Sequence, residues 1–191
     1  MTTKILLDNV RGCMVGAVLG DCLGAPVECK YWSGIETRSV KKHFDTYKQN
    51  GSERGVISDE CLMKYTDDTA MARQVVLSLI NKNGLDAPDM AKRFVEAYKD
   101  EPWRGYGQSV GEVFNKLGQT NFTSEANVFL PASEQFNGDG SYGNGAAMRV
   151  HPIGLLGKDM LEVEMMAEKQ AKLTHAHDDG IMGSILQATG K

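Results

Sequence analysis

The chain has 191 residues, of which 41% are hydrophobic and 24% are charged, and its formal net charge is −4. A chain of this size buries about 70% of the surface of its unfolded form, so a single domain can fold without a disulfide or a structural metal. The mildly acidic balance without long runs of like charge argues against a protein that binds a nucleic acid backbone, and the short apolar stretches argue against a membrane span or a signal peptide. We therefore expect an intracellular protein that contacts neither DNA nor a membrane directly.

The N-terminal part of the sequence predicts one helix followed by a long irregular stretch. Apolar residues recur at helical spacing from Leu6 to Val18, and the segment Gly20 to Gly24 with Pro26 beyond it ends the pattern. From about Lys30 to Lys64 the sequence is mostly polar, interrupted by glycines and without a strong period. This stretch predicts a long loop with one short helix near Ser39 to Tyr47.

Five further helices are expected in the rest of the chain. One covers Asp68 to Asn81, where Asn83-Gly84 supplies a C-terminal stop, and the next begins after Asp86 as its N-cap and ends before Pro102. The helical period also predicts helices over Ser109 to Leu117, Met160 to Leu173 and Asp178 to Ala188. Because no segment alternates as a strand would, the predicted fold class is all-α.

The last predicted helix still runs when the chain stops at Lys191. Its apolar residues Ile181 and Ile185 need a cover, and nothing after Ala188 supplies a cap or a packing partner. We expect either a short final element or a domain whose C-terminal part is missing.

The four cysteines do not form a metal-binding or disulfide pattern. They contain no C-x-x-C pair and lie in apolar or mixed surroundings, so we expect mostly reduced thiols in the core. They are Cys13, Cys22, Cys29 and Cys61.

The segment Thr66-Asp67-Asp68-Thr69 stands directly before an apolar helix and has two interpretations. Thr66 or Asp67 can serve as an N-cap, with the second acid stabilised by the helix dipole. A hydroxyl and two adjacent carboxylates also present hard oxygen ligands in different directions, as Mg²⁺ or Ca²⁺ requires. The spacing alone does not choose between a cap and a metal site.

A second candidate is the segment Gly138 to Gly145, which has four glycines in eight residues. Its backbone can approach a ligand closely and present several N–H groups to a phosphate, or it can be a flexible surface loop. Tyr142 favours binding slightly, because an aromatic ring between glycines is poorly placed for a core and well placed to stack on a base.

Two further segments are weaker candidates for a functional site, one acidic and one rich in histidine. Asp21 and Glu28 flank a turn at the end of the first helix, where Asp21 can bond to backbone groups of the turn and Glu28 can be solvated. The segment Thr174 to Asp179 contains two histidines and two acids, as zinc sites do, but an N-cap by Asp178 beside an exposed histidine explains it more simply.

In this order the motifs resemble those of the ADP-ribosylglycohydrolase family, also called ADP-ribosyl-acceptor hydrolases, over about residues 9 to 188. The similarity is to the branch that releases ADP-ribose from serine and degrades poly(ADP-ribose). The segments that carry it are Arg11-Gly12-Cys13, Gly20-Asp21, Glu28, Tyr65 to Arg73, Arg104 to Gly107, Gln135 to Gly138, Gly140 to Gly145, Ala147 to Val150 and Leu173 to Ala176.

The resemblance implies a compact orthogonal all-α domain over residues 1–191, built around two Mg²⁺ ions and an ADP-ribose site. It implies that Glu28 is the catalytic acid–base carboxylate and a metal ligand, together with Thr66, Asp67 and Asp68. The substrate-binding residues implied by the resemblance are Asp67, Gly105, Tyr106, Gly107, Phe136, Asp139, Gly140, Ser141, Tyr142, Gly143, Asn144, Gly145 and His175.

One departure from the family pattern concerns the metal centre. The family carries a second acidic motif, Asp-x-Asp-Thr, late in the chain, and no such string follows Thr69 here. Each ion would therefore lose about half of its protein ligands, and Mg²⁺ held mostly by water binds weakly. We expect an incomplete domain with most of the ligand loop and half of the metal site.

The implied function is Mg²⁺-dependent hydrolysis of the O-glycosidic bond between ADP-ribose and serine, and of poly(ADP-ribose), with O-acetyl-ADP-ribose as a further substrate. Its partners would be ADP-ribose, ADP-ribosylated proteins and poly(ADP-ribose), bound by a monomer of the nucleus and cytoplasm, and of the mitochondrial matrix as a further compartment. The alternatives are an ADP-ribose-binding protein without catalysis and a structural relative similar to the crystallins of jellyfish lenses.

Overall fold

The computed structural model describes residues 3–26, 28, 38, 41–42, 45 and 63–190, and every regular element within them is a helix. The α-helices are α1 (Thr3–Gly24), α3 (Asp67–Lys82), α4 (Ala87–Asp100), α5 (Gln108–Leu117), α6 (Glu125–Ser133), α7 (His151–Leu156), α8 (Met160–Ala171) and α9 (Asp178–Thr189). Two 3₁₀ turns, η2 (Gln135–Gly138) and η3 (Asn144–Ala146), lie between α6 and α7. The predicted all-α class is confirmed for the described residues.

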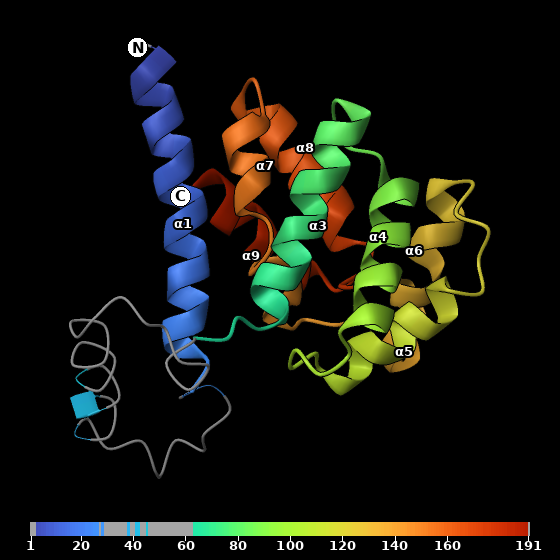
Figure 1. Ribbon diagram of the computed structural model, residues 1–191. Helices are drawn as coiled ribbons and strands as arrows, with labels where there is room; N and C mark the ends of the chain where they lie inside the picture. Colours follow the sequence, from blue (N-terminus) through green and yellow to red (C-terminus); the bar gives the residue numbers. More distant parts are fainter. Residues whose placement is uncertain are drawn as a thin grey trace.

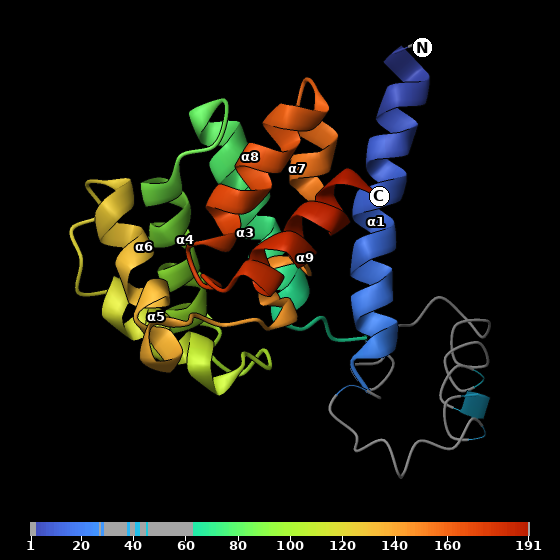
Figure 2. The same ribbon diagram turned by 180° about the vertical axis from the view of Figure 1, so that it is seen from behind.

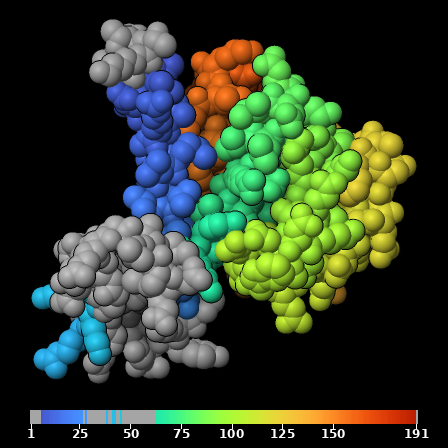
Figure 3. Space-filling model, in the orientation of Figure 1, coloured from blue at the N-terminus to red at the C-terminus, as the bar shows by residue number. Residues whose placement is uncertain are grey.

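The helices form one packed body with α1 along its side. Helix α3 lies in the middle and packs on α4 and α7, while α8 and α9 pack on each other behind it (Figures 1 and 2). Helices α5 and α6 cover α4 at the end away from α1. Helix α1 touches α3 and α7, and in the space-filling view it stands as a separate ridge beside them (Figure 3). In the described part of the chain, no helix is both long and apolar enough to cross a membrane.

The hydrophobic core lies between α3, α4, α5, α7 and α8. Phe94 and Phe114 meet edge to face, with ring centroids 6.4 Å apart, and both rings are almost fully buried. Met71 and Val75 of α3 and Ile153 of α7 close the same core. Burial of such side chains stabilises the fold by about 1.5–3 kcal/mol each, so the helices that carry the site are fixed independently of it.

The capping signals in the sequence correctly located α3 and α4. Thr66 caps α3 by accepting a hydrogen bond from Asp68 N, and Asn83 ends it in the left-handed conformation at φ 52°. Asp86 caps α4 by accepting from Asp89 N. The predicted starts and ends therefore agree with the structure to within a residue or two, because short polar side chains satisfy the unpaired backbone groups at helix ends.

Two helices were not predicted. Helix α6 begins at the N-cap Ser124, which accepts a hydrogen bond from Asn127 N, and contains Pro131. Helix α7 has only 6 residues and carries Pro152 in its first turn. A proline and a short length both weaken the helical period in a sequence, so packing against the core determines these two helices.

Both ends of α9 differ from the prediction. The N-cap is His177, whose Nδ1 accepts from Asp179 N, and Asp178 is already the first helical residue. At the other end the helix extends to Thr189, and Gly190 caps it, with φ 67° and its N–H donated to Leu186 O. A glycine without Cβ takes this left-handed conformation easily, which makes it the common stop for a helix.

The predictions for residues 30–64 lie almost wholly outside the described residues. These are the long loop and the short helix near Ser39 to Tyr47, and Cys29 and Cys61 also lie outside. Of the other cysteines, Cys22 is buried and Cys13 is half-buried, and both are free thiols as expected. Burial raises the pKa of the Cys22 thiol, with the charge of Asp21 as a second cause.

Candidate functional site

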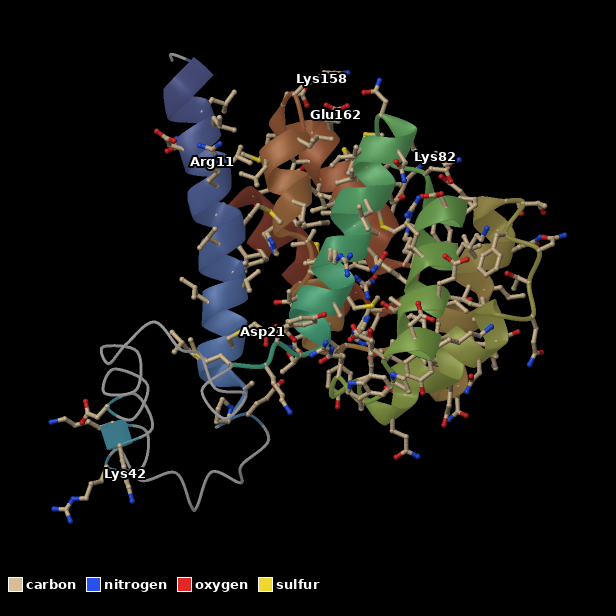
Figure 4. All side chains as sticks on the ribbon, viewed as in Figure 1. Arg11, Asp21, Lys42, Lys82, Lys158 and Glu162 are labelled. Atoms are coloured by element: carbon tan, nitrogen blue, oxygen red, sulfur yellow. The ribbon has the colours of Figure 1, made fainter. Side chains whose placement is uncertain are left out.

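The N-terminus of α3 is anchored by a carboxylate from another helix. Asp21 of α1 accepts hydrogen bonds from Thr66 N at 3.0 and 3.1 Å, from Thr66 Oγ1 at 2.7 Å and from Thr69 N at 3.1 Å. Figure 4 shows Asp21 at the end of α1 beside the start of α3. The expectation that Asp21 bonds within its own turn is therefore wrong. Its negative charge meets the positive end of the α3 dipole, which stabilises the junction of α1 and α3.

Asp67 and Asp68 begin α3 and lie next to one another in a partly dry environment. Asp67 is only 8% exposed, and its backbone N–H donates to Arg104 O at 2.9 Å. Burial, the charge of Asp68 and weaker contributions from Glu28 and Asp21 raise the pKa of Asp67 to about 7. Burial and the charges of Asp21 and Glu28 also raise the pKa of Asp68. The charges of neighbouring carboxylates therefore disfavour the ionised form of both Asp67 and Asp68.

A cleft of about 560 Å³ opens between α1 and α3 beside these carboxylates. Asp21, Asp68 and Thr69 are among its polar lining residues, and its apolar walls come from α1, α3 and Met148. Clefts of this size hold small ligands and exclude most bulk water from what they bind.

The donor chemistry of the cluster fits Mg²⁺ in kind. Thr66, Asp67, Asp68 and Glu28 offer only oxygen atoms, and two of their carboxyl groups have a raised pKa that a divalent cation would lower. As the described residues are arranged, no three histidine, cysteine or acidic side chains converge to hold an ion. Glu28 is exposed beyond the end of α1, where its N–H donates to Gly24 O at 3.1 Å.

The segment Arg104 to Gly107 closes one side of the acidic pair. Arg104 Nη1 donates to Tyr65 O at 3.1 Å, and its guanidinium lies 3.7 Å from the centre of the Tyr65 ring. Gly105 at φ 96° comes so close that a Cβ there would lie 3.6 Å from Asp67 Oδ1. The structure thus brings Gly105 next to Asp67, while Gly107 is the exposed N-cap of α5.

Tyr106 lies in an aromatic cluster under the acidic pair. Its ring meets Tyr98 at 5.1 Å and Phe114 at 6.0 Å between centroids, and its buried hydroxyl has no hydrogen-bond partner among the described residues. Burial and the charge of Asp67 raise the pKa of the phenol, so it stays protonated at neutral pH. Tyr106 therefore supports the floor of the site and keeps a free hydroxyl near Asp67.

The glycine-rich segment is held against the chain before α9. Gly140 at φ 75° lies so close that a Cβ would be 2.6 Å from His177 N, and a Cβ on Gly180 would be 2.7 Å from Ser141 O. Phe136 and Asn137, just before it, both adopt left-handed φ angles of 52° and 62°. Such contacts leave little free space, so the interpretation as a loosely attached surface loop is not favoured.

Two aromatic rings at this segment are exposed and not part of the core. Tyr142 is 76% exposed and meets only the edge of the His177 ring, at 5.8 Å, and Phe136 is 55% exposed. Between them Asp139 is exposed, and Ser141 is buried and accepts a hydrogen bond from Gly143 N at 3.2 Å. The segment therefore presents two ring faces and its own backbone to solvent, an arrangement suited to a nucleotide.

His175 lies underneath the glycine-rich segment. It is 6% exposed, and its ring contacts the backbone at Gly143 and Gly145, where a Cβ would come within 3.3 and 2.6 Å of ring atoms. Burial and the nearby charge of Arg149 lower the pKa of His175 to about 3. The ring is therefore neutral at physiological pH.

Arg149 links the two halves of the site and was not predicted as a functional residue. It is 1% exposed and donates to Gln170 and Thr174, and burial lowers its pKa to about 9, which the charge of Asp67 opposes. The sequence held a weak signal, because Arg149 is a lone charge between the apolar residues Met148 and Val150. Its partners lie 21 and 25 residues away, which no local pattern reveals.

In a comparison with known protein families, residues 2–190 of the chain match the sequence model of the ADP-ribosylglycohydrolase family. ADP-ribosylhydrolase ARH3 of Gallus gallus is 48% identical over 179 residues, which are 93% of this chain and 48% of that protein. ADP-ribosylhydrolase ARH3 of Homo sapiens is 45% identical over 182 residues, 95% and 48% of the two chains.

A bacterial relative is more distant. The ADP-ribosyl-[dinitrogen reductase] glycohydrolase of Rhodospirillum rubrum is 31% identical over 183 residues, 93% of this chain and 54% of that protein. The chain thus spans about half the length of the curated relatives it matches.

Proposed function

Because this chain belongs to the ADP-ribosylglycohydrolase family, we propose that it takes part in hydrolysis of the bond between ADP-ribose and its acceptor. The observation that carries the proposal is the acidic pair Asp67 and Asp68 at the start of α3, where burial and the charges of neighbouring carboxylates raise the pKa of both. A carboxyl group with a raised pKa is typical of functional sites, where a cation or a proton can neutralise its charge.

The proposal extends to the acceptor and the metal. We infer that the bond cleaved is the O-glycosidic bond to serine, or that between units of poly(ADP-ribose), with O-acetyl-ADP-ribose as a further substrate. Mg²⁺ would be held by Thr66, Asp67, Asp68 and Glu28, whose oxygen atoms suit a hard cation. When bound, a pair of such ions would polarise the ribose hydroxyls and the attacking water.

The remaining site residues would bind the ADP-ribose. The N–H groups and small side chains of Asp139 to Gly145 would surround the diphosphate, and the exposed rings of Phe136 and Tyr142 would flank the adenine. His175 would lie beside the ligand, under the glycine-rich segment. Gly105 to Gly107 would line the site next to Asp67, and the φ of 96° at Gly105 favours glycine there.

The chemistry of the chain's own groups is general acid–base catalysis. The Glu28 carboxylate would take a proton from water as the water oxygen bonds to the anomeric carbon of the ribose. The bond from that carbon to the serine oxygen breaks, its electron pair stays on the oxygen, and a proton from solvent or from Glu28 then completes the serine hydroxyl.

The direct test is release of ADP-ribose from an ADP-ribosyl-serine peptide by this chain and by a version that carries the full length of its relatives. We expect release that depends on Mg²⁺ and falls at least about 100-fold in Glu28→Gln and Asp67→Ala. Glu96→Gln, an exposed carboxylate of α4, is the matched control and should retain activity. Release that persists without Mg²⁺ or in both site variants would contradict the proposal.

A second candidate function is binding of ADP-ribose without turnover. It is favoured by the finding that no three acidic, histidine or cysteine side chains of the described residues converge on an ion, whereas the glycine-rich segment is fully formed. Calorimetry with free ADP-ribose separates the two candidates. Binding that is equally strong with and without Mg²⁺, together with no release from the peptide, would support the second candidate and oppose the first.

We also propose the setting in which this function operates. The partners would be ADP-ribosylated proteins and poly(ADP-ribose), met by a monomer inside the cell, in the nucleus, the cytoplasm or the mitochondrial matrix, without direct DNA contact. Light scattering with and without poly(ADP-ribose) tests the monomer, and a dimer in the absence of ligand would contradict it.

A further inference from the structure

The core beneath the glycine-rich segment contains a wholly buried arginine. Arg149 Nε donates to Gln170 Oε1 at 2.9 Å, and Nη2 donates to Gln170 O at 3.1 Å and to Thr174 Oγ1 at 2.7 Å. Its guanidinium also lies 4.4 Å from the centre of the Phe94 ring. Among the described residues no acidic side chain forms a salt bridge with it. Burying a cation among neutral groups costs free energy, so the contacts of Arg149 point to a role beyond packing.

The hydroxyl of Thr174 stands between Arg149 and His175. A guanidinium can only donate hydrogen bonds, so Thr174 Oγ1 must accept from Arg149. The same oxygen lies 2.8 Å from His175 Nδ1. The single hydroxyl proton of Thr174 is thus free to point at Nδ1, which makes Nδ1 the acceptor and leaves the ring proton on Nε2.

The other tautomer leaves a buried group unsatisfied. If Nδ1 carried the proton and donated to Thr174 Oγ1, the hydroxyl proton of Thr174 would have no acceptor among the described residues, because Arg149 and Nδ1 would both be donors. An unpaired donor in a buried position is unfavourable. The doubly protonated ring is disfavoured separately, because burial and Arg149 lower the pKa of His175 to about 3.

The Nε2 side of the ring faces the glycine-rich segment. A Cβ on Gly143 would lie 3.3 Å from Nε2 and one on Gly145 would lie 3.0 Å from it, so glycines keep this side of the ring uncovered. Within the described part of the chain Nε2 has no hydrogen-bond partner. The ring therefore turns an unused donor toward the segment.

The same network also holds the end of that segment. Gln170 Nε2 donates to Ala146 O at 2.9 Å and to Ser184 Oγ at 2.7 Å, while its Oε1 accepts from Arg149. Arg149 thus fixes both the ring of His175, through Thr174, and the backbone at Ala146, through Gln170. One buried network sets the distance between the histidine donor and the glycine-rich segment.

We propose that Arg149 and Thr174 are positioning residues that hold His175 as its neutral Nε2–H tautomer, so that this N–H donates to an oxygen atom of the ligand bound over residues 139–145. The ligand class is a nucleoside diphosphate sugar, whose phosphate and ribose oxygens all accept hydrogen bonds. The hydrogen bond from His175 to the ligand rests on the proposed function. The tautomer of the ligand-free protein does not depend on it.

The tautomer can be read from the ring nitrogen resonances of ¹⁵N-histidine-labelled protein. The chain has four histidines, and His175→Gln identifies the signals of His175 by their loss. We expect Nδ1 at the position of an unprotonated nitrogen and Nε2 at that of a protonated one. A wild-type spectrum with the proton on Nδ1 would overturn the proposal whatever the variants do.

Thr174→Val and Thr174→Ser form the matched pair of variants. Valine keeps the shape and removes the hydroxyl, whereas serine keeps the hydroxyl. We expect the His175 resonances to move toward the Nδ1–H or a mixed form in Thr174→Val, with about a tenfold loss of ADP-ribose affinity, and to stay unchanged in Thr174→Ser. Unchanged resonances and affinity in a folded Thr174→Val protein would contradict the proposal.

The wild-type histidine spectrum tests the hydrogen-bond network, and ADP-ribose binding tests the proposed function. If wild-type protein shows the Nε2–H form but does not bind ADP-ribose, the assignment of the network is supported and the proposed function is contradicted. If it binds ADP-ribose while Nδ1 carries the proton, the proposed function stands and the network assignment is wrong. If Thr174→Val does not fold, the wild-type spectrum still decides.

Discussion

The acidic cluster at the start of α3 and the network under the glycine-rich segment solve the burial of charge in opposite ways. Burial and the charges of Asp21 and Glu28 raise the pKa of both Asp67 and Asp68, and within the described residues neither carboxylate forms a salt bridge. Arg149, in contrast, donates three hydrogen bonds to neutral oxygen atoms, two on Gln170 and one on Thr174. The first region stores unfavourable free energy that a ligand can relieve, while the second is arranged in advance.

The two regions also differ in how they are held together. The acidic cluster depends on one side chain, Asp21, across a junction between α1 and α3 that has few other contacts. The network lies between α8 and α9, whose interface is the most extensive in the described chain. Disturbing the network should therefore affect the whole fold, and disturbing the cluster should act locally.

The largest effect on stability should come from Arg149→Ala. The change leaves a cavity and removes partners from Gln170 and Thr174, so we expect a loss of about 3–5 kcal/mol in the free energy of unfolding, measured with urea. Arg93→Ala is the control, since Arg93 forms a partly exposed pair with Asp89 at 2.6 Å and should cost less than about 1 kcal/mol. Equal losses in the two variants would contradict a stabilising role of the buried network around Arg149.

A smaller loss is expected for Asp21→Ala. This variant removes the hydrogen bonds to Thr66 and Thr69 and leaves the first turn of α3 without its anchor. We expect the free energy of unfolding to fall by about 2 kcal/mol. Hydrogen exchange should accelerate at the start of α3 and along α1 but not in α8 or α9. The control is Asp8→Ala, an exposed position of the same helix α1, which should change neither the free energy of unfolding nor the hydrogen exchange. Faster exchange in α9 would show that the regions are not independent.

Asp67→Asn should stabilise the ligand-free protein in a pH-dependent way. The folded-state pKa of Asp67 is raised to about 7, so its protonated form contributes stability that is fully present below about pH 4 and lost as the pH rises through 7. Asparagine is neutral at every pH and keeps this contribution. Relative to wild type, we expect the free energy of unfolding to rise by about 1–3 kcal/mol at pH 8 and hardly at all at pH 4.

The control for this change is Asp178→Asn. Asp178 is the first residue of α9 as Asp67 is of α3, but it is exposed. Thermal unfolding between pH 4 and pH 8 should show no comparable gain for it. A gain for Asp67→Asn that is the same at both pH values would rule out titration of Asp67 as the cause.

The smallest effect on stability is expected for Tyr142→Ala. The ring is exposed and touches little besides His177, so the free energy of unfolding should change by less than about 0.5 kcal/mol. Affinity for ADP-ribose should still fall about tenfold, because a stacking face for the base is lost, and Tyr142→Phe should retain it. A large loss of stability with unchanged affinity would indicate a structural role for Tyr142.

Helix ends were the part of the fold that the sequence predicted best. Thr66, Asp86 and Asn83 act through bonds to backbone groups within a few residues, so their effect is visible in a short window. Helices α6 and α7 were missed because Pro131 and Pro152 disturb the local pattern and packing against the core compensates. The cap at Gly190 was missed because a single glycine does not reveal its φ angle.

The residue types of the candidate site were recognisable, but their states were not. The sequence indicated oxygen ligands at Thr66 to Asp68 and close approach at Gly140 to Gly145. It did not indicate that Asp21, 45 residues from Thr66, would bond to it. Nor did it indicate that Arg149 and Thr174 would set the protonation of His175, since both depend on residues brought together only by folding.

The sequence by itself thus determined the helical class, the caps and the order of the motifs, because these follow from local backbone bonding and hydrophobic period. Only the tertiary structure decided which carboxylates share one low-dielectric region and which histidine nitrogen carries the proton. Burial and long-range hydrogen bonds set those properties, and both depend on the three-dimensional packing of helices that lie far apart in the chain.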